Sequence, residues 1–358
     1  MPLDARPDPR ETEVAPERPV LPFNGIALVG EAPGDTEVER MRPFCGQSGR
    51  VLDAVLRASG IERKECWVGN VFSTKLEDNE VKAERARRGA GWEQFWSGNV
   101  ARLAHDLAAL RPTVVVALGG TALLALAGTP SIAKMRGQPM MGTGAFKSFK
   151  LLPTYHPAFI LRQWDFYNIA IGDMQRALAE RDRGPGIIWP HRTLYVAPSL
   201  AEVEAHLPTW CSQAGPDNPL SCDIETGWGM VRGVAFAPSQ LEAMYVPFIS
   251  LNTLSRSYWH TFEEEKRAWL AVKAALESPC PKLGQNYANY DAIWLLTKMG
   301  IRTKGFTHDL RLLHKSLYPE LPASLGFMGA AYASQGCWKA WASHAKATGD
   351  NDAEKRDA

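Results

Sequence analysis

Residues 25–34 read Gly-Ile-Ala-Leu-Val-Gly-Glu-Ala-Pro-Gly, and this stretch decides the fold. Its first half is a short continuous apolar run ending in Gly30, which is typical of a buried parallel strand. Its second half, from Glu31 to Gly34, combines glycine and proline and therefore predicts a tight turn. Because open α/β sheets bind ligands beyond the carboxyl ends of their strands, we expect this turn to form part of a site.

Three further apolar runs are likewise followed by glycine or polar residues. They are residues 66–69 before Asn70, residues 114–118 before Gly119, and residues 151–154 before His156. Helix-like segments lie between these runs, at about 48–59, 92–110, 120–127 and 165–182. The alternation of strand and helix predicts an α/β fold with a doubly wound, mostly parallel sheet. The polar residues after the strands then share one edge of that sheet.

Four separated motifs fall at this predicted edge and its loops. The stretch GEAPGDTEVERMRPFCGQSG (30–49) holds two of them, and Asn70 and HPAFILR (156–162) follow in order. Together they resemble the uracil-DNA glycosylase superfamily, and within it the branch called family 4. The resemblance runs from about residue 25 to about residue 178. It implies a glycosylase-like domain over residues 21–182 that hydrolyses the N-glycosidic bond of uracil in DNA.

The resemblance implies a pocket for one base flipped out of the DNA stack. Uracil binding is expected from Gly30, Phe44 and Asn70, with the Phe44 ring, held after Pro43, stacking on the base. An asparagine amide carries one donor group and one acceptor on a plane. It therefore matches N3–H and O4 of uracil and mismatches cytosine, which presents the reverse pattern.

Three residues are expected to carry the catalysis. His156 should donate a hydrogen bond to O2 as uracil leaves as an anion, like a group of an oxyanion hole. Glu31 and Glu37 match the acidic positions of the family motif, and either can orient the attacking water or exclude a 5-methyl group. Their division of roles stays open.

Family 4 members usually hold an iron–sulfur cluster with four cysteines, and this chain departs from that pattern. No cysteine precedes Cys45, no C-x-x-C spacing occurs, and Ser73 to Leu76 replace a cysteine-containing segment after Asn70. A cluster needs converging thiolates, and this half offers only Cys45 and Cys66. We therefore expect a glycosylase domain without an iron–sulfur cluster, which needs no cofactor.

A second domain is expected after a charged, glycine- and proline-rich linker at 183–192. Residues 220–226 predict a strand on which Asp223 and Glu225 point the same way, because alternate residues share a face. This D-x-E, followed by Asn286 and by Asp291 in an N-x-x-x-Y-D pattern, resembles the 3′–5′ exonuclease superfamily. The resemblance implies a ribonuclease H-like α/β domain over 193–340, related to the proofreading domains of family A polymerases.

In that family, two metal ions clamp the attacking and leaving oxygens of phosphodiester hydrolysis. Asp223, Glu225 and Asp291 are the candidate catalytic residues and ligands for Mg²⁺ or Mn²⁺, which prefer carboxylate oxygens. The family's last carboxylate has no match at its usual spacing, and His344 reaches Asp350 one residue too late. We therefore expect an incomplete, apparently truncated domain, unless a neighbouring chain completes it. A disordered lead-in is expected at 1–20 and a polar tail at 341–358.

The chain of 358 residues has 40 Lys and Arg against 39 Asp and Glu, a formal net charge of +1. Affinity for DNA must therefore come from local basic patches. One candidate patch is Lys82, Arg85, Arg87, Arg88 and Arg102. No apolar run is long enough for a membrane span, and six cysteines without paired spacing fit a reducing cytoplasm. The family resemblance implies the cytoplasm of a bacterium or of a phage-infected host cell.

Two alternatives to uracil excision stay open. The glycosylase-like domain can be a non-catalytic module that binds uracil-containing DNA or a DNA polymerase chain. Alternatively, proofreading 3′–5′ exonuclease activity is the main function. The pairing of repair and proofreading modules is typical of a phage or phage-derived replication protein, an inference from family analogy.

Overall fold

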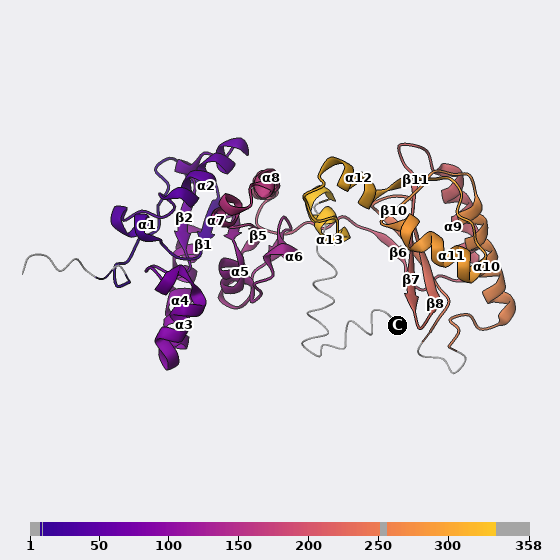
Figure 1. Ribbon diagram of the computed structural model, residues 1–358, viewed down its shortest axis with the longest axis horizontal. Coiled ribbons are helices and arrows are strands. Elements are labelled where there is room, and N and C mark those ends of the chain that lie inside the picture. Colours follow the sequence, from indigo (N-terminus) through magenta and orange to yellow (C-terminus); the bar gives the residue numbers. More distant parts are fainter. Residues whose placement is uncertain (1–7, 9, 251–255, 334–358) are drawn as a thin grey trace, which may run out of the picture. The chain divides into compact units, whose positions relative to one another are not determined.

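The computed structural model describes residues 8, 10–250 and 256–333 (Figure 1). The described chain divides into two units. The first contains the residues up to Ile188 together with Gly326 to Ala333, and the second runs from Trp189 to Leu325. In this part of the chain, no helix is long and apolar enough to cross a membrane.

The sheet of the first unit is built from the apolar runs of the sequence. Its strands are β1 (Ile26–Gly30), β2 (Trp67–Asn70), β3 (Val114–Leu118), β4 (Met140–Met141) and β5 (Lys150–Thr154), in the order β2-β1-β3-β5-β4. Only β4 is antiparallel to its neighbour, and β1, β2, β3 and β5 are buried along their whole length. The predicted doubly wound, mostly parallel sheet is confirmed.

Helices cover both faces of this sheet (Figure 1). Val115 and Ala117 of β3 share one apolar core with α4 and α5, whereas Val114 and Val116 share the other core with α2 and α8. The helices are α1 (Asp35–Arg40), α2 (Gln47–Ala58), α3 (Val81–Arg88), α4 (Trp92–Leu110), α5 (Gly120–Ala127), α6 (Ile132–Met135), α7 (Pro157–Arg162) and α8 (Tyr167–Asp182). Burial on both faces explains why the strands read as unbroken apolar runs.

Part of the lead-in that we expected to be disordered is ordered. Glu17 pairs with Val68 of β2 through two backbone hydrogen bonds of 2.8 and 3.0 Å. Its carboxylate accepts from Arg42 at 2.9 Å and from Arg63 at 2.7 Å. The expectation was wrong here because it considered only local composition, whereas these contacts come from residues 25–51 positions away.

The second unit contains a six-stranded sheet in the order β11-β10-β7-β8-β9-β6. Its strands are β6 (Thr193–Tyr195), β7 (Leu220–Gly227), β8 (Met230–Ala237), β9 (Glu242–Pro247), β10 (Lys282–Gly284) and β11 (Phe306–Asp309). Strands β7, β8 and β9 form an antiparallel meander, and β10 and β11 continue the sheet in parallel beyond β7. This is the ribonuclease H-like arrangement that the sequence predicted.

Alternation along β7 separates core residues from exposed acids. Leu220, Cys222 and Ile224 are buried in a core shared with α9 and α10, whereas Asp223 and Glu225 are exposed on the other face. The helices of this unit are α9 (Leu200–Gln213), α10 (Phe262–Glu277), α11 (Asp291–Met299) and α12 (Leu310–Leu317).

After α12, the chain returns to the first unit. Helix α13 (Leu325–Met328) and a π-helical turn (Gly329–Ala333) bury Phe327 and Met328, and Arg176 of α8 donates to the carbonyls of Ala330 and Ala331. The expected tail at 341–358, with His344 and Asp350, lies outside the described residues.

Candidate active site

A cavity of about 410 Å³ opens at the carboxyl edge of the first sheet. Five residues singled out in the sequence line it: Glu31, Glu37, Phe44, Asn70 and His156. They come from the ends of β1, β2 and β5, from α1, and from the loop before α2. The structure therefore brings together residues that lie up to 125 positions apart, because parallel strands end at the same sheet edge.

Gly30 lies under this cavity and allows two of its walls to meet. A Cβ atom at Gly30 would lie 2.4 Å from Asn70 Oδ1 and 2.4 Å from Phe44 Cζ, so a larger residue would displace both side chains. Phe44 itself adopts a left-handed backbone conformation with φ of 49°, which is strained for a bulky residue. Its ring centroid lies 5.7 Å from that of His156.

The side chain of Asn70 is held at the floor of the cavity with one unused acceptor. Its Oδ1 is buried and has no hydrogen-bond partner among the residues that the structure describes. Leaving a buried acceptor unsatisfied costs free energy, so this oxygen is suited to a donor on a bound ligand. Arg102 of α4 fixes the backbone here by donating to the carbonyls of Asn70 and Val71 at 2.8 Å each.

His156 presents a hydrogen-bond donor to the cavity. Its Nδ1 accepts from the backbone N–H of Ala158 at 3.2 Å, so the neutral ring carries its proton on Nε2. Burial, assisted by the positive charge of Arg162, lowers the pKa of His156 to about 4 and keeps the ring neutral. Gly119 (φ +91°) backs this ring, since a Cβ there would lie 2.9 Å from His156 Cβ.

The two glutamates have different surroundings. Glu31 accepts a hydrogen bond from Thr121 Oγ1, and burial raises the pKa of its carboxyl group. Glu37 accepts from the N–H of Gly34 at 3.2 Å with one oxygen and from the N–H of Gly46 at 3.1 Å with the other. Glu37 therefore ties the turn after β1 to the Phe44 loop, whereas Glu31 binds the Thr121 hydroxyl and lines the cavity.

Arg63 is a determinant of this site that the sequence reasoning missed. Its guanidinium donates to the carbonyls of Pro43 and Phe44 at 2.9 and 3.0 Å, and it is clamped by Glu17 and Asp53 at 2.7 and 2.8 Å. These contacts hold the strained Phe44 loop from behind. A charged residue that serves distant carbonyls leaves no local pattern, so no sequence signal pointed to it.

Comparison with known proteins agrees with this geometry. Residues 22–176 match the family described as the uracil DNA glycosylase superfamily. The type-4 uracil-DNA glycosylase of Thermotoga maritima is 33% identical over 156 residues, which cover 42% of this chain and 75% of that protein. The chain belongs to the uracil-DNA glycosylase superfamily.

Two further relatives of the glycosylase unit, residues 22–176, are also type-4 uracil-DNA glycosylases. The type-4 enzyme of Pyrobaculum aerophilum is 29% identical over 39% of this chain and 69% of its own length, and that of Archaeoglobus fulgidus is 30% identical over 38% and 66%. The EXD2 exonuclease domain, soaked in Mn and GMP, aligns with 37% of this chain and 62% of its own at 18% identity. Its TM-score of 0.26 is too low to define a shared fold.

The thiols of the glycosylase unit do not fit an iron–sulfur cluster. Cys45 Sγ donates to the carbonyl of Thr36 at 3.5 Å, and Cys66 Sγ donates to that of Glu62 at 3.6 Å. Burial raises the pKa of both thiols, that of Cys66 to about 11. A cluster needs four converging thiolates, whereas the described part of this unit offers two thiols that bind separate carbonyls.

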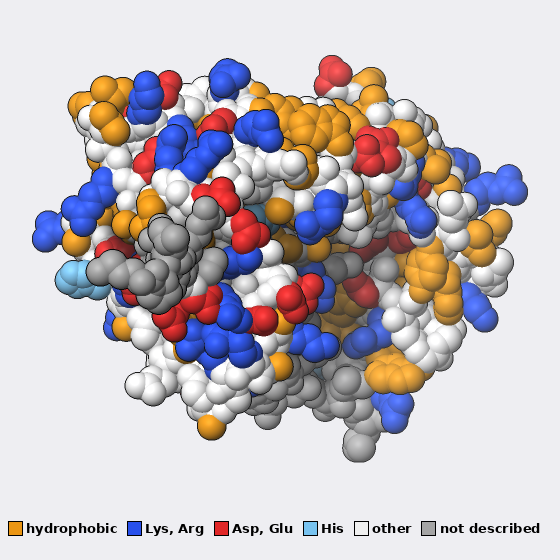
Figure 2. Space-filling model, turned by 60° about the vertical axis from the view of Figure 1, so that its left-hand side comes forward, with side chains coloured by type: hydrophobic (Ala, Val, Ile, Leu, Met, Phe, Trp, Pro, Cys, Tyr) orange, Lys and Arg blue, Asp and Glu red, His pale blue; other side chains and the backbone are white. Residues whose placement is uncertain are grey.

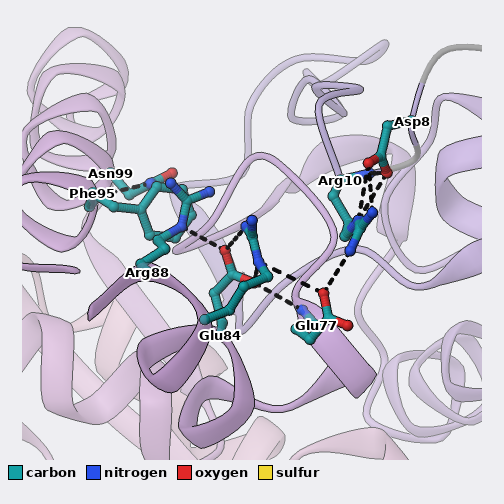
Figure 3. A network of polar contacts seen from close by, with 8 residues as sticks. Asp8, Arg10, Glu77, Glu84, Arg88, Phe95 and Asn99 are labelled. Atoms are coloured by element: carbon teal, nitrogen blue, oxygen red, sulfur yellow. Dashed lines mark hydrogen bonds and ion pairs between the residues drawn. The ribbon is translucent and has the colours of Figure 1, made fainter. Parts of the chain in front are cut away.

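Three of the five arginines and lysines of the predicted phosphate-binding patch have partners inside the protein. Arg87 and Arg88 both bind the fully buried Glu84, and Arg88 also stacks over Phe95 at 3.5 Å (Figure 3). Arg102 serves the carbonyls of Asn70 and Val71. Figure 2 shows basic, acidic and apolar side chains interspersed over one face. The closeness of these basic residues in the sequence does not reveal that they have partners inside the protein.

In the second unit, Asp223 and Asp291 are neighbours. Burial, followed by the charge of Asp223, raises the pKa of Asp291 to about 7, while the N–H of Ile224 donates to Asp291 Oδ1 at 2.9 Å. Glu225 lies on the same face of β7 as Asp223. Nevertheless, the described chain contains no group of three or more His, Cys, Asp or Glu side chains arranged to hold a metal ion. The predicted three-carboxylate magnesium site is therefore not formed among the residues that the structure describes.

Proposed function

We propose that the glycosylase unit hydrolyses the N-glycosidic bond of uracil in DNA. The observation that carries this proposal is a single cavity lined by an aromatic ring, a buried amide with a free acceptor, and a neutral imidazole donor: Phe44, Asn70 and His156. The type-4 enzymes that it resembles bear the same activity in their names. Uracil-containing DNA is thus the proposed substrate.

Base selection follows from the Asn70 amide. Its unpartnered Oδ1 accepts from N3–H of uracil, and its Nδ2 donates to O4. Cytosine offers an acceptor at N3 and a donor at N4, so it leaves both groups mismatched. A site with buried, unmatched polar groups rejects such an analogue strongly.

Bond cleavage leaves negative charge on O2 of the departing base. His156 Nε2–H donates to that oxygen, and the low pKa of the ring keeps the neutral donor form in place at neutral pH. Glu31, with its partner Thr121, orients the attacking water, whereas Glu37 holds the two loops that shape the cavity. This proposal gives the water-orienting role to Glu31 and a loop-holding role to Glu37, and it leaves the exclusion of a 5-methyl group unassigned.

The test is incubation with a labelled single-stranded oligonucleotide that contains one uracil, followed by alkaline cleavage at the abasic product. We expect His156→Ala to slow excision roughly a hundredfold or more, because losing one such donor costs about 2.7–4 kcal/mol. Asn70→Asp should weaken discrimination against cytosine, since a carboxyl group offers acceptors to the cytosine amine. His105→Ala, an exposed histidine on α4, is the matched control and should excise normally.

An unchanged rate for His156→Ala would overturn the assignment of this cavity. Tight binding of the uracil oligonucleotide without any cleavage by the unaltered protein would instead support the alternative of a non-catalytic DNA-binding module.

The adjacent carboxylates Asp223 and Asp291 favour a second, weaker role. We propose that the second unit binds single-stranded 3′ ends and passes them to a DNA polymerase supplied by another chain. Because the acids of the described chain do not form a metal site by themselves, Mg²⁺ or Mn²⁺ would need DNA phosphates as further ligands here, and such an ion would supply charge stabilisation for phosphodiester hydrolysis.

A further inference from the structure

A shallow groove of about 400 Å³ lies next to the base cavity, and the glycosylase chemistry proposed above does not use it. Its lining consists of Gln47, Arg50, Val51, Ala54, Leu161 and Trp164. Helices α2 and α7 border both hollows, since Ser48 of α2 and Phe159 of α7 line the base cavity. The groove therefore lies beside the cavity proposed to take the flipped base, on the same two helices.

The apolar wall of the groove is a preorganised aromatic platform. The Trp164 indole stacks on the ring of Tyr167 with centroids 4.6 Å apart and planes inclined by 11°. Trp164 is nevertheless 57% exposed, so a large part of its surface remains free. Leu161, which is 44% exposed, adds an aliphatic surface beside it. An indole already fixed on one face loses little conformational freedom when a ligand stacks on it.

Two arginines give this region the charge of a phosphate-binding surface. Arg50 lines the groove and Arg162 lines the neighbouring cavity, and both are exposed. Unlike Arg87, Arg88 and Arg102, neither makes an ion pair or a side-chain hydrogen bond with any residue that the structure describes. The groove lining contains no acidic residue.

We infer that this groove holds the nucleobase next to the flipped uridine in the same DNA strand. The base stacks on Trp164, and Arg50 and Arg162 contact the phosphates on either side. Aromatic stacking combined with free cations is how proteins bind single-stranded nucleic acid without reading its sequence. The inference rests on the proposed function, because the base cavity sets where the neighbouring base must go.

The test is a double-mutant cycle between protein and DNA. Affinity is measured by fluorescence anisotropy with a labelled single strand of about 15 nucleotides. The strand carries 2′-fluorinated deoxyuridine, which resists excision, and an abasic tetrahydrofuran replaces either its 5′ or its 3′ neighbour. Because stacking contributes about 1–3 kcal/mol per base, Trp164→Ala should weaken binding of the intact strand roughly 5- to 150-fold. The unaltered protein should bind one of the two abasic strands more weakly than the intact strand, by the same factor as Trp164→Ala.

The two changes together should cost no more than either alone, and Trp164→Phe should lose less affinity than Trp164→Ala. Trp189→Ala removes an equally exposed tryptophan of the second unit and serves as the control. Arg50→Gln should reduce the slope of log affinity against log salt concentration by about 1, the contribution of one phosphate contact. Circular dichroism checks that each variant is folded.

The inference is overturned if Trp164→Ala binds the intact strand like the unaltered protein. It is also overturned if the loss of affinity caused by Trp164→Ala adds fully to the loss caused by each of the two abasic replacements. Uracil excision with no such coupling would refute the proposed role of the groove and would leave the glycosylase assignment unaffected. Coupling without excision by the unaltered protein would support the groove as a nucleobase site and refute the proposed function.

Discussion

At the scale of single residues, the candidate site depends on groups whose protonation differs from their ordinary behaviour. His156 is kept neutral because its pKa falls to about 4, below the usual 6.5. Glu31 changes in the opposite direction, since burial raises the pKa of its carboxyl group above 4.5. A neutral donor therefore lies near a carboxylate that takes up a proton more readily than an exposed glutamate. Both shifts follow from desolvation of the charged form.

These shifts predict the pH dependence of excision. In the proposed mechanism the ionised form of Glu31 orients water, so the rate should fall with decreasing pH, at a pH above the ordinary 4.5 of a glutamate. His156 stays neutral until about pH 4 and should add no limb near 6.5. Single-turnover rates between about pH 4.5 and 8 check this. Glu31→Gln should be slow and lack the limb, whereas a limb near 6.5 that His156→Ala abolishes would contradict the assignment.

At the scale of elements, strand ends carry the site and loops complete it. The strands and their shared edge could be predicted from the sequence because buried parallel strands leave unbroken apolar runs ended by glycine or polar residues. The positions of Glu31, Asn70 and His156 at that edge follow from the pattern of apolar runs alone. Thr121 could also have been found, since it follows Gly119 and Gly120 at the same edge. Arg63 and Arg102 could not, because their partners are backbone carbonyls far along the chain.

The loop that carries Phe44 should depend on Arg63 more than on Arg42, although both arginines bind Glu17. Arg63→Gln removes bonds to two carbonyls and two carboxylates in a mostly buried setting, and should destabilise the protein by about 2–3 kcal/mol. Arg42→Gln loses only an exposed pair and should cost less than about 1 kcal/mol. Denaturant unfolding measures both free energies. Equal losses would show that the carbonyl contacts contribute little.

Strand β7 leads to a prediction about the second unit. Only Asp223 and Asp291 are neighbours there, and no set of three ligands is arranged for a metal ion in the described chain. Since two-metal hydrolysis needs both ions, the chain alone should degrade a labelled single strand only feebly with Mg²⁺ or Mn²⁺. A duplex with a recessed 3′ end is the companion substrate. Robust 3′ degradation that Asp223→Ala abolishes would contradict this, and would implicate an acid outside the described residues.

At the scale of the whole molecule, one chain carries two α/β units with separate candidate sites and a formal net charge of only +1. The interspersed charges of Figure 2 agree with local rather than global attraction to DNA. For attraction to DNA, arginines beside the base cavity that form no ion pair with the described residues therefore matter more than the total number of basic residues. Arg50 and Arg162 are such residues, whereas Arg87 and Arg88 are occupied internally.

The whole chain should also be free of iron. Cys45 and Cys66 donate to separate carbonyls, so the described glycosylase unit offers no set of four converging thiolates. Protein purified anaerobically should be colourless, without a broad visible absorption band. Iron and sulfide analysis of the same preparation checks this directly. Stoichiometric amounts of both would contradict the prediction and would require cysteines from distant parts of the chain to converge.

The bond between Glu17 and Arg63 has a consequence for where the catalytic module begins. The family match starts at residue 22, yet Glu17 precedes it and anchors the arginine that supports Phe44. A version trimmed to the family boundary would keep every residue that faces the base. It would nevertheless lose the brace behind one wall and leave a buried guanidinium without its strongest counterion. The segment that has to be inherited together for this site to stay intact is therefore longer than the segment that matches the family.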